Sequence, residues 1–262
     1  MSLYKKEQPE YLRLALDSMI NQTVKPDEIV LVEDGPLTPE LYEVVEEYKS
    51  YLTIVVNEEN LGLGLALNKG LKACKYELVA RMDTDDIANP DRCEKQIHFF
   101  EDHPTTDILG GQIDEFIDDP VNVVGRRIVP ETDSELKIYM RKRCPFNHMT
   151  VMYKKSSVLV AGSYQDWFWN EDYYLWIRMA LKNQQFANLP DTLVNVRVGK
   201  DMYARRGGEK YFKSEIGIQK LMLKKGIIDK PTYAVNCVKR FIVQKALPNS
   251  IRGWVFKTFA RS

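Results

Sequence analysis

Three aspartates within four residues are the feature of this sequence that points most directly to chemistry. A hydrophobic segment, Leu78–Met82, is followed at once by Asp83, Asp85 and Asp86. If the segment is a strand, alternation places Asp83 and Asp85 on one side, where one carboxylate can bind a divalent cation and the other can accept a hydrogen bond from a hydroxyl group. Like charges at this spacing repel unless something positive lies among them, so the cluster predicts a ligand site.

Each acidic group also has a simpler interpretation. Asp85 or Asp86 could cap a helix that Asn89-Pro90-Asp91 would open, because acidic residues favour helix starts. A second group, Glu33-Asp34-Gly35, also follows an apolar run, and its composition alone would suit a turn. A turn can bind a ligand as well. Both groups lie at the carboxyl ends of predicted strands, where ligands collect in α/β sheets, and this agreement places them in one site.

The elements that would position these acids alternate between helix and strand. The run Ile29–Val32 is continuously apolar, which is typical of a strand buried on both faces. Helices are predicted over Tyr11–Ile20, from about Pro39 to Tyr51 and from Leu61 to about Cys74, and further strands over Leu52–Val56 and Leu78–Met82. This alternation predicts an α/β fold with a mostly parallel sheet.

Length and charge limit the class of protein. The chain has 262 residues, of which 44% are hydrophobic, enough for one large catalytic domain. Its 37 basic residues balance 37 acidic ones, which argues against nucleic acid as a partner. The cysteines show no zinc-binding pattern, and no apolar run approaches the ~18 residues that span a bilayer. We expect a cytoplasmic protein that can also lie at the inner face of the cytoplasmic membrane.

The amino-terminal segment departs from the expected pattern. A sheet of this type would normally open with a full strand, but only Met1–Tyr4 precedes the polar residues Lys5, Lys6 and Glu7. We therefore expect the first strand to be mostly truncated. Such a truncation would weaken a ligand pocket that the strand helps to line.

Three sequence blocks carry a resemblance to a known family. Residues 18–23 with 26–35 combine a helix end with a strand that finishes in acids, 60–64 with 66–70 form a glycine-containing block, and 81–86 hold the aspartates. Over about its first 200 residues, the chain resembles the family 2 glycosyltransferases, nucleotide-sugar enzymes of the GT-A fold. The resemblance implies an α/β enzyme that transfers a sugar with inversion.

The resemblance also implies roles for the strand-end acids. Asp34, with Glu33 beside it, would accept the imide hydrogen of a uracil base. Asp83 would bind the ribose hydroxyls, and Asp85 would hold magnesium or manganese on the diphosphate of a UDP-sugar. Many family members place a histidine metal ligand near the position of Gly199, where this chain has none. By themselves, the residues show that carboxylates suit hydroxyls, N–H groups and hard cations.

An aromatic and acidic run, residues 166–178, supplies the candidate catalytic groups. The resembled family has a Glu-Asp step here that Glu171-Asp172 matches, which implies that Asp172 takes the proton of the acceptor hydroxyl while Glu171 orients the acceptor. Aromatic faces beside carboxylates suit sugars, although aromatics at this spacing are more often core. Glu171 and Asp172 could also form the first turn of a helix, and both interpretations can hold at once.

The remaining candidates for the donor site are basic. His148, in the block Arg143–Thr150, could contact a donor phosphate or the acceptor, although a lone histidine is more often structural. This block, Arg197 and the pair Arg205 and Arg206 resemble those of amylovoran-type exopolysaccharide glycosyltransferases. The arginines suit a loop that closes on a diphosphate, with a solvated surface as the alternative.

Residues 227–262 are predicted to form a basic amphipathic tail after a catalytic domain over residues 1–226. From residue 231 onward the chain contains basic and aromatic residues but no acid. The tail could lie on an anionic membrane or pack on the catalytic domain. We expect peripheral membrane contact, because an exopolysaccharide enzyme would meet a lipid-linked acceptor.

Together these features predict an inverting glycosyltransferase, a hexosyltransferase. It would move a sugar from a UDP-sugar to a hydroxyl of a saccharide or lipid-linked acceptor in cell-surface or exopolysaccharide biosynthesis. Two other classes stay open: a nucleotide-sugar-binding scaffold without turnover, and a nucleotidyltransferase. The latter would need a glycine-rich phosphate loop with a lysine near the amino terminus, which the sequence does not contain.

Overall fold

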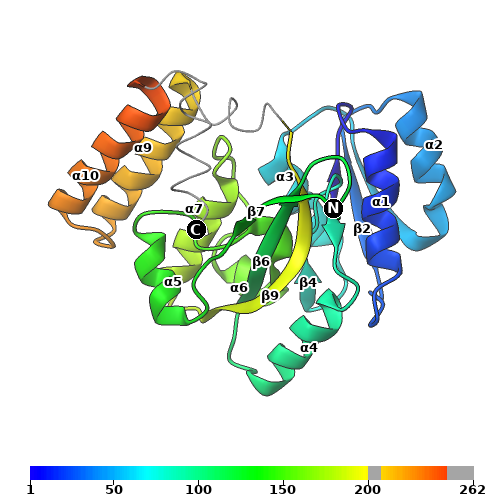
Figure 1. Ribbon diagram of the computed structural model, residues 1–262, viewed down its shortest axis with the longest axis horizontal. Coiled ribbons are helices and arrows are strands. Elements are labelled where there is room, and N and C mark those ends of the chain that lie inside the picture. The colour runs from blue at the N-terminus through cyan, green and yellow to red at the C-terminus, as the bar shows by residue number, and fades with distance from the viewer. Residues whose placement is uncertain (200–207, 247–262) are drawn as a thin grey trace.

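The computed structural model describes residues 1–199 and 208–246, which form two sheets with helices packed around them (Figure 1). The amino-terminal part alternates strand and helix as predicted. Its elements are β1 (Ser2–Leu3), α1 (Pro9–Ile20), β2 (Ile29–Asp34), α2 (Pro39–Glu47), a 3-10 turn (Lys49–Tyr51), β3 (Leu52–Asn57) and α3 (Leu63–Ala73).

The first sheet is parallel and has the order β1-β2-β3. Ser2 lies opposite Val32 on one side of β2, and Leu52 lies opposite Ile29 on the other. All six residues of β2 are buried, which confirms the prediction for the apolar run Ile29–Val32 and extends it to Glu33 and Asp34. Strand β1 consists of Ser2 and Leu3 only, so it pairs with a small part of β2.

Helices α1 and α2 pack on this sheet because their apolar residues recur at helical spacing. Their buried side chains are Leu12, Ala15, Leu16 and Met19 in α1, and Leu41, Val44 and Val45 in α2. Each helix has a proline in its first turn, where the missing N–H removes no intrahelical bond. Together with Leu31 of β2 these helices form one large apolar core.

The second sheet has the order β4-β8-β6-β9-β5, with β7 also paired to β6. Its strands are β4 (Leu78–Ala80), β5 (Ile87–Ala88), β6 (Ile108–Phe116), β7 (Val123–Arg127), β8 (Met152–Lys154) and β9 (Phe186–Arg197).

The α/β fold is confirmed, but mostly parallel pairing holds for the first sheet alone. In the second sheet β6 and β9 pair in parallel, whereas β4 with β8, β5 with β9, β6 with β7 and β6 with β8 pair antiparallel. Antiparallel strands need no crossover helix, and residues 117–122 suffice to join β6 to β7.

The helices around the second sheet enclose another core. They are α4 (Arg92–Asp102), α5 (Asp133–Met140), α6 (Lys155–Val160), α7 (Glu171–Ala180) and α9 (Glu209–Lys224), with a 3-10 turn at His148–Thr150. Trp176 of α7 is fully buried and packs edge-on against Phe146, with ring centroids 5.5 Å apart. The aromatic run before and within α7 therefore divides: Tyr173 and Trp176 belong to the core, whereas Trp169 is 50% exposed.

The described part of the tail is helical and packs on the rest of the molecule. Helix α10 (Lys230–Phe241) lies along α9 at one end of the structure, away from α1 and α2 (Figure 1), and a π-helical turn (Ile242–Ala246) follows it. Asn236 donates hydrogen bonds to Oε1 of Gln219 and to the carbonyl of Arg141, at 2.8 and 2.9 Å. Arg240 reaches the carbonyl of Lys142 at 3.0 Å.

Residues 247–262, which include Trp254, Phe256 and Phe259 of the predicted tail, lie outside the described part of the chain. In the described ranges, 1–199 and 208–246, no helix has both the length and the apolar character needed to cross a bilayer.

Candidate active site

A row of alternating charges links the end of β4 to the start of α7. Arg81 forms a two-pronged ion pair with Asp83, with nitrogen–oxygen distances of 2.7 and 2.9 Å. Oδ2 of Asp83 also lies 3.1 Å from Nε2 of His148, and Nδ1 of the same imidazole lies 3.0 Å from Oδ2 of Asp172. The structure therefore joins in one network three residues that the sequence assigned separately, Asp83, His148 and Asp172.

The charges in this row fix one another's protonation. Burial opposes ionisation of Asp83, but Arg81 and His148 outweigh it and hold the pKa of Asp83 far below its usual range. Burial and Arg81 oppose a charge on His148, but Asp83 and Asp172 outweigh them and raise the pKa of His148 to about 9. Burial would likewise raise the pKa of Asp172, yet the hydrogen bond and charge of His148 lower it. At neutral pH the row is a carboxylate, an imidazolium and a second carboxylate next to a guanidinium.

The aspartate cluster has the composition of a cation site. Strand β4 ends at Ala80, so strand alternation does not orient these residues, and a bend gathers them instead. Carboxylate oxygens of Asp83, Asp85 and Asp86 lie within 4.8 Å of one another. Helix α4 begins at Arg92 with Asp91 as its N-cap residue, which excludes the interpretation that Asp85 or Asp86 caps it.

The electrostatics of this cluster fit a divalent ion. Burial and the negative charge of Asp83 raise the pKa of Asp85 to about 7, and burial with Asp85 raises that of Asp86 well above its usual value. A positive ion among these oxygens would reverse both shifts. A set of donors made of oxygen atoms only suits magnesium or manganese. The sequence assigned no separate ligand role to Asp86, and the structure adds it to the candidate ligands.

Glu171 and Asp172 form the first turn of α7, as the sequence allowed. Burial, followed by the charge of Asp172, raises the pKa of Glu171 to about 7. The side chain of Glu171 packs over Gly64, where an added Cβ would lie 3.0 Å from Cβ of Glu171. Gly64 belongs to the second block of the family resemblance, and its lack of a side chain makes room for the candidate catalytic pair.

The two acids at the end of β2 differ in their surroundings. Asp34 accepts hydrogen bonds from Asn57 Nδ2 and from the backbone N–H groups of Leu61 and Gly62, at 2.9, 2.9 and 3.0 Å. Its carboxylate therefore fixes the loop that leads into α3. Glu33 is 5% exposed, and burial raises its pKa. No hydrogen bond or ion pair joins its carboxylate to another residue in the described ranges.

Arg197 lies at the end of β9 and is tied to the aspartate bend. Its backbone N–H donates to Oδ1 of Asp86 at 2.9 Å, and its Nε donates to the carbonyl of Asp85 at 3.2 Å. The guanidinium lies over the ring of Tyr11, 3.8 Å from the centroid, and its Nη2 is buried without a hydrogen-bond partner. The predicted donor-binding residues Arg205 and Arg206 lie outside the described residues.

Two further residues of the site had no functional assignment from the sequence. Arg81 was recognised only as part of the aspartate motif, although an arginine at the end of an apolar strand signals a buried partner. Cys144 lies beside the candidate catalytic pair, with Sγ 3.9 Å from Oδ2 of Asp172. Burial, followed by the charge of Asp172, raises the pKa of this thiol. No pattern in the sequence pointed to Cys144.

Comparison with known proteins shows the family to which this chain belongs. The glycosyl transferase family 2 model matches residues 1–168. The chain belongs to this family. It is a glycosyltransferase, as its homologues are. An uncharacterized glycosyltransferase of Haemophilus influenzae is 46% identical over 100% of this chain and 97% of its own length. Amylovoran biosynthesis glycosyltransferase AmsE of Erwinia amylovora is 44% identical over 85% of this chain and 84% of its own length.

A third relative is named by its reaction. The Escherichia coli UDP-Gal:alpha-D-GlcNAc-diphosphoundecaprenol beta-1,3-galactosyltransferase is 36% identical to this glycosyltransferase over 100% of the chain and 95% of its own length. Solved structures share the fold at lower identity. Staphylococcus aureus TarS 1–349 in complex with UDP-GlcNAc has a TM-score of 0.67 at 19% identity, covering 92% of this chain and 71% of that one.

The mannosyltransferase PcManGT from Pyrobaculum calidifontis, in complex with GDP-Man and Mn²⁺, gives a TM-score of 0.65 at 16% identity and covers 96% of this chain and 70% of its own. At these identities the likeness shows the fold, which is GT-A.

We predict that His148 is protonated at neutral pH and that Asp172 helps to keep it so. Its folded pKa of about 9 lies above the unfolded value of ~6.5. The stability that His148 contributes is therefore fully present below pH ~6.5 and is lost as pH rises through ~9. A ¹⁵N NMR titration of the imidazole should show this pKa in the intact protein and a lower one in Asp172→Asn. The exposed Asp166 provides a control, since Asp166→Asn should leave the pKa of His148 unchanged. A His148 that titrates near 6.5 in all three proteins would contradict the charge row.

Proposed function

We propose that this glycosyltransferase transfers a sugar from a UDP-sugar to an acceptor hydroxyl with inversion, with Asp172 as general base. The observation that carries the proposal is the Asp83–His148–Asp172 network, because it places an ionised carboxylate of α7 one imidazole away from the aspartates that suit a nucleotide diphosphate and its cation. In this arrangement the aspartates proposed to bind the donor lie next to the carboxylate proposed to deprotonate the acceptor.

The donor side is assigned from the strand-end acids. Oδ1 of Asp34 already receives two hydrogen bonds and Oδ2 one, so Oδ2 keeps an acceptor site for the uracil imide N–H. The carboxylate of Glu33, which has no partner in the described part of the chain, lies next to it in sequence. Asp83, held rigidly by Arg81, is suited to the ribose hydroxyls. The name of the galactosyltransferase mentions UDP-Gal, and the TarS structure is a complex with UDP-GlcNAc. Both support a uridine nucleotide in the donor.

Asp85, with Asp83 and Asp86 beside it, would hold magnesium or manganese. When bound, the cation would neutralise negative charge on the departing diphosphate. Arg197 would contribute a second positive group, because its buried Nη2 has a free donor close to the backbone of Asp85. The Mn²⁺ in the complex of the mannosyltransferase PcManGT supports this assignment.

In the proposed reaction the acceptor oxygen attacks the anomeric carbon from the face opposite the leaving group. The bond between that carbon and the diphosphate oxygen breaks as the new glycosidic bond forms, and its electron pair leaves with UDP. Asp172 takes the proton of the acceptor hydroxyl. His148 holds Asp172 ionised and oriented, and Glu171, whose pKa is about 7, binds the acceptor. Opposite pKa shifts in adjacent carboxyls suit two distinct roles.

We propose a lipid-linked saccharide as the acceptor, in surface or exopolysaccharide biosynthesis, and peripheral contact with an anionic membrane. The names of AmsE and of the diphosphoundecaprenol galactosyltransferase support this assignment. The outer face of α10 carries Val235, Val238 and Phe241, each more than half exposed, with the exposed Lys239 among them. An apolar face beside a lysine suits an anionic lipid surface.

Asp85→Asn should abolish metal-stimulated binding of UDP. Calorimetric titration of UDP with Mn²⁺ should give a Kd at least about tenfold lower than without the ion, a change of ~1.4 kcal/mol. The variant should show no difference between the two conditions. The exposed Asp102 provides a matched control, Asp102→Asn, that should behave like the intact protein. GDP should bind more weakly than UDP, and equal binding of both would contradict a uridine donor.

Asp172→Asn should lower kcat of sugar transfer by about 10²- to 10⁴-fold, the usual contribution of a general base. Asp166→Asn should have little effect, and Glu171→Gln should act mainly on KM for the acceptor. UDP binding by Asp172→Asn, measured by calorimetry, reports whether the donor site stays intact. A loss of kcat confined to Glu171→Gln would assign the base to Glu171 instead.

Val238→Asp should weaken binding to anionic vesicles in a flotation assay, because it places a charge on the outer face of α10. Neutral vesicles should not bind the intact protein. Val121, which is 89% exposed far from α10 in sequence, provides the control Val121→Asp. Equal flotation of both variants would show that α10 does not contribute to membrane binding.

A further inference from the structure

Trp169 combines an exposed side chain with a backbone conformation that a bulky residue rarely adopts. It is 50% exposed, and its φ angle of 55° lies in the left-handed region. Glycine or asparagine is the usual choice there, because a larger side chain makes this conformation unfavourable. A residue keeps such a conformation only where its surroundings enforce it, and these positions cluster at ligand sites. Burial in the core does not explain a tryptophan at this position.

The residues on both sides of Trp169 are fastened to Ser214 of α9. Oγ of Ser214 donates to the carbonyl of Phe168 at 2.6 Å and accepts from Nδ2 of Asn170 at 3.0 Å. The indole N–H of Trp167 donates to the carbonyl of Ser214 at 3.2 Å. Asn170 and Ser214 are both buried. These bonds fix the backbone of Trp169 from both sides while its own side chain stays at the surface.

The ring of Trp169 is supported without being covered. It stacks on Phe168, with centroids 5.0 Å apart and planes 11° apart, and the tilted ring of Tyr211 lies 6.1 Å away. Nζ of Lys210 lies 4.0 Å from the centroid of Phe168. Within residues 1–199 and 208–246, the indole N–H of Trp169 has no hydrogen-bond partner. A supported aromatic ring that is open to solvent, with a free donor at its edge, suits the apolar face of a sugar.

Trp169 lies close in the chain to the candidate catalytic pair. Glu171 follows it by two residues, so their Cα atoms are at most about 7 Å apart. Glu171 packs over Gly64, and Asp172 contacts His148 at 3.0 Å. This spacing brings the indole ring and the two carboxylates within reach of one bound sugar.

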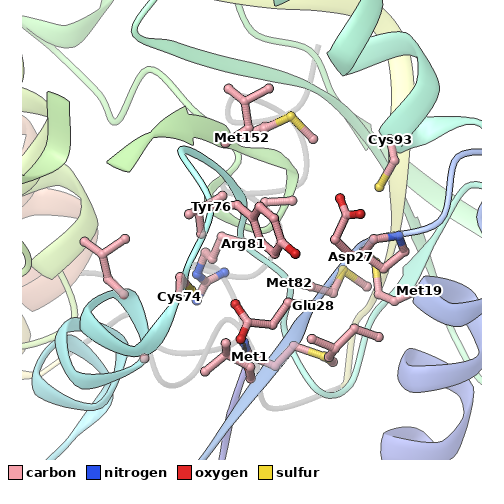
Figure 2. Close-up of a pocket in the computed structure, with 18 of the residues that line it drawn as sticks. Met1, Met19, Asp27, Glu28, Cys74, Tyr76, Arg81, Met82, Cys93 and Met152 are labelled. Atoms are coloured by element: carbon pink, nitrogen blue, oxygen red, sulfur yellow. Dashed lines mark hydrogen bonds between the residues drawn. The ribbon is translucent and has the colours of Figure 1, made fainter. Parts of the chain in front are cut away.

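A cavity of about 410 Å³ between β2 and β4 is the other hollow to consider for a sugar (Figure 2). Figure 2 shows Met19, Met82 and Met152 among its walls, which are mostly apolar. Arg81 also lines it, but its guanidinium is already paired with Asp83. Sugar hydroxyls that lose water need hydrogen-bond partners, so this cavity suits a saccharide poorly. The exposed ring of Trp169 beside two carboxylates fits a saccharide better.

We propose that Trp169 forms the floor of a subsite that binds a pyranose ring of the acceptor saccharide. The inference rests on the proposed sugar transfer for naming this saccharide as the acceptor. The C–H groups of one sugar face would pack on the indole, whose face carries partial negative charge, and the indole N–H would donate to a hydroxyl. Glu171 and Asp172 would receive the hydroxyl groups at the reacting end. A pyranose with several C–H groups on one face is therefore the preferred ligand.

The binding test needs no turnover. Saturation-transfer difference NMR would measure binding of the methyl β-glycosides of glucose, galactose and N-acetylglucosamine, with and without UDP and Mn²⁺. At least one probe should bind the intact protein through the protons of one ring face. Trp169→Ala should raise its Kd at least about tenfold, and Trp169→Phe, which keeps an aromatic face, by less than about threefold. Tyr51, which is 56% exposed just before β3, provides the control Tyr51→Ala, which should leave Kd unchanged.

A transfer assay separates this inference from the proposed reaction. With a UDP-hexose as donor and the best-bound pyranoside as acceptor, Trp169→Ala should raise KM for the acceptor at least about tenfold. Its KM for the donor and its kcat should stay nearly unchanged. Asp172→Asn should do the reverse, losing kcat while it still binds the pyranoside. If Asp172→Asn kept full kcat, the proposed base would be wrong, whereas pyranoside binding lost in Trp169→Ala would still support the subsite.

A second variant distinguishes lost binding from a folding defect. Trp169→Gly relieves the unfavourable φ angle, so it should have a higher Tm than Trp169→Ala and yet bind the pyranoside no better. Equal pyranoside binding by the intact protein and both variants would overturn the proposal, and so would the failure of every probe to bind the intact protein. Weaker binding of octyl β-glucoside but not of methyl β-glucoside in Trp169→Ala would assign the ring to a lipid chain and overturn it as well.

Discussion

The ion pair between Arg81 and Asp83 is the interaction on which the active site depends. The Arg81 side chain is 3% exposed and carries its charge at the end of β4, where only a paired anion makes that charge tolerable. Asp83 supplies the anion, and its second contact holds a protonated His148, which in turn holds Asp172. Removing one partner of such a buried pair leaves an uncompensated charge at a cost of about 3–5 kcal/mol. The aspartate bend and the start of α7 are therefore one electrostatic unit.

This row explains why adjacent acids behave differently. Asp83 and Asp172 each face a cation and stay ionised. Burial, followed by the charge of a neighbouring carboxylate, raises the pKa values of Asp85 and Glu171 to about 7. Asp83 and Asp172 are therefore ionised at neutral pH, whereas Asp85 and Glu171 are readily protonated. A divalent ion would stabilise the ionised form of Asp85, whereas a hydroxyl group can only exchange a hydrogen bond with Glu171.

The sequence predicts those parts of the structure that local patterns decide. Continuous apolar runs and helical spacing located α1, β2, α2, β3 and α3, and residue types located the acids at the strand ends. Local patterns do not record which distant strands pair, so the antiparallel order of the second sheet was not visible. The contact of His148 with Asp83 joins residues 65 positions apart and was equally hidden. The sequence around Asp34 suited a turn or a ligand site, and nothing in it shows that the backbone N–H groups of residues 61 and 62 would donate to this carboxylate.

Helix α10 has a consequence for any attempt to shorten the chain. Asn236 and Arg240 donate to the carbonyls of Arg141 and Lys142, which immediately precede the segment that carries Cys144 and His148. Cutting the chain at residue 226 would deprive both carbonyls of these donors and release one end of that segment. The carboxyl-terminal helices thus hold one end of the loop that carries these candidate site residues, so the boundary of the catalytic fold is not at residue 226 but beyond α10.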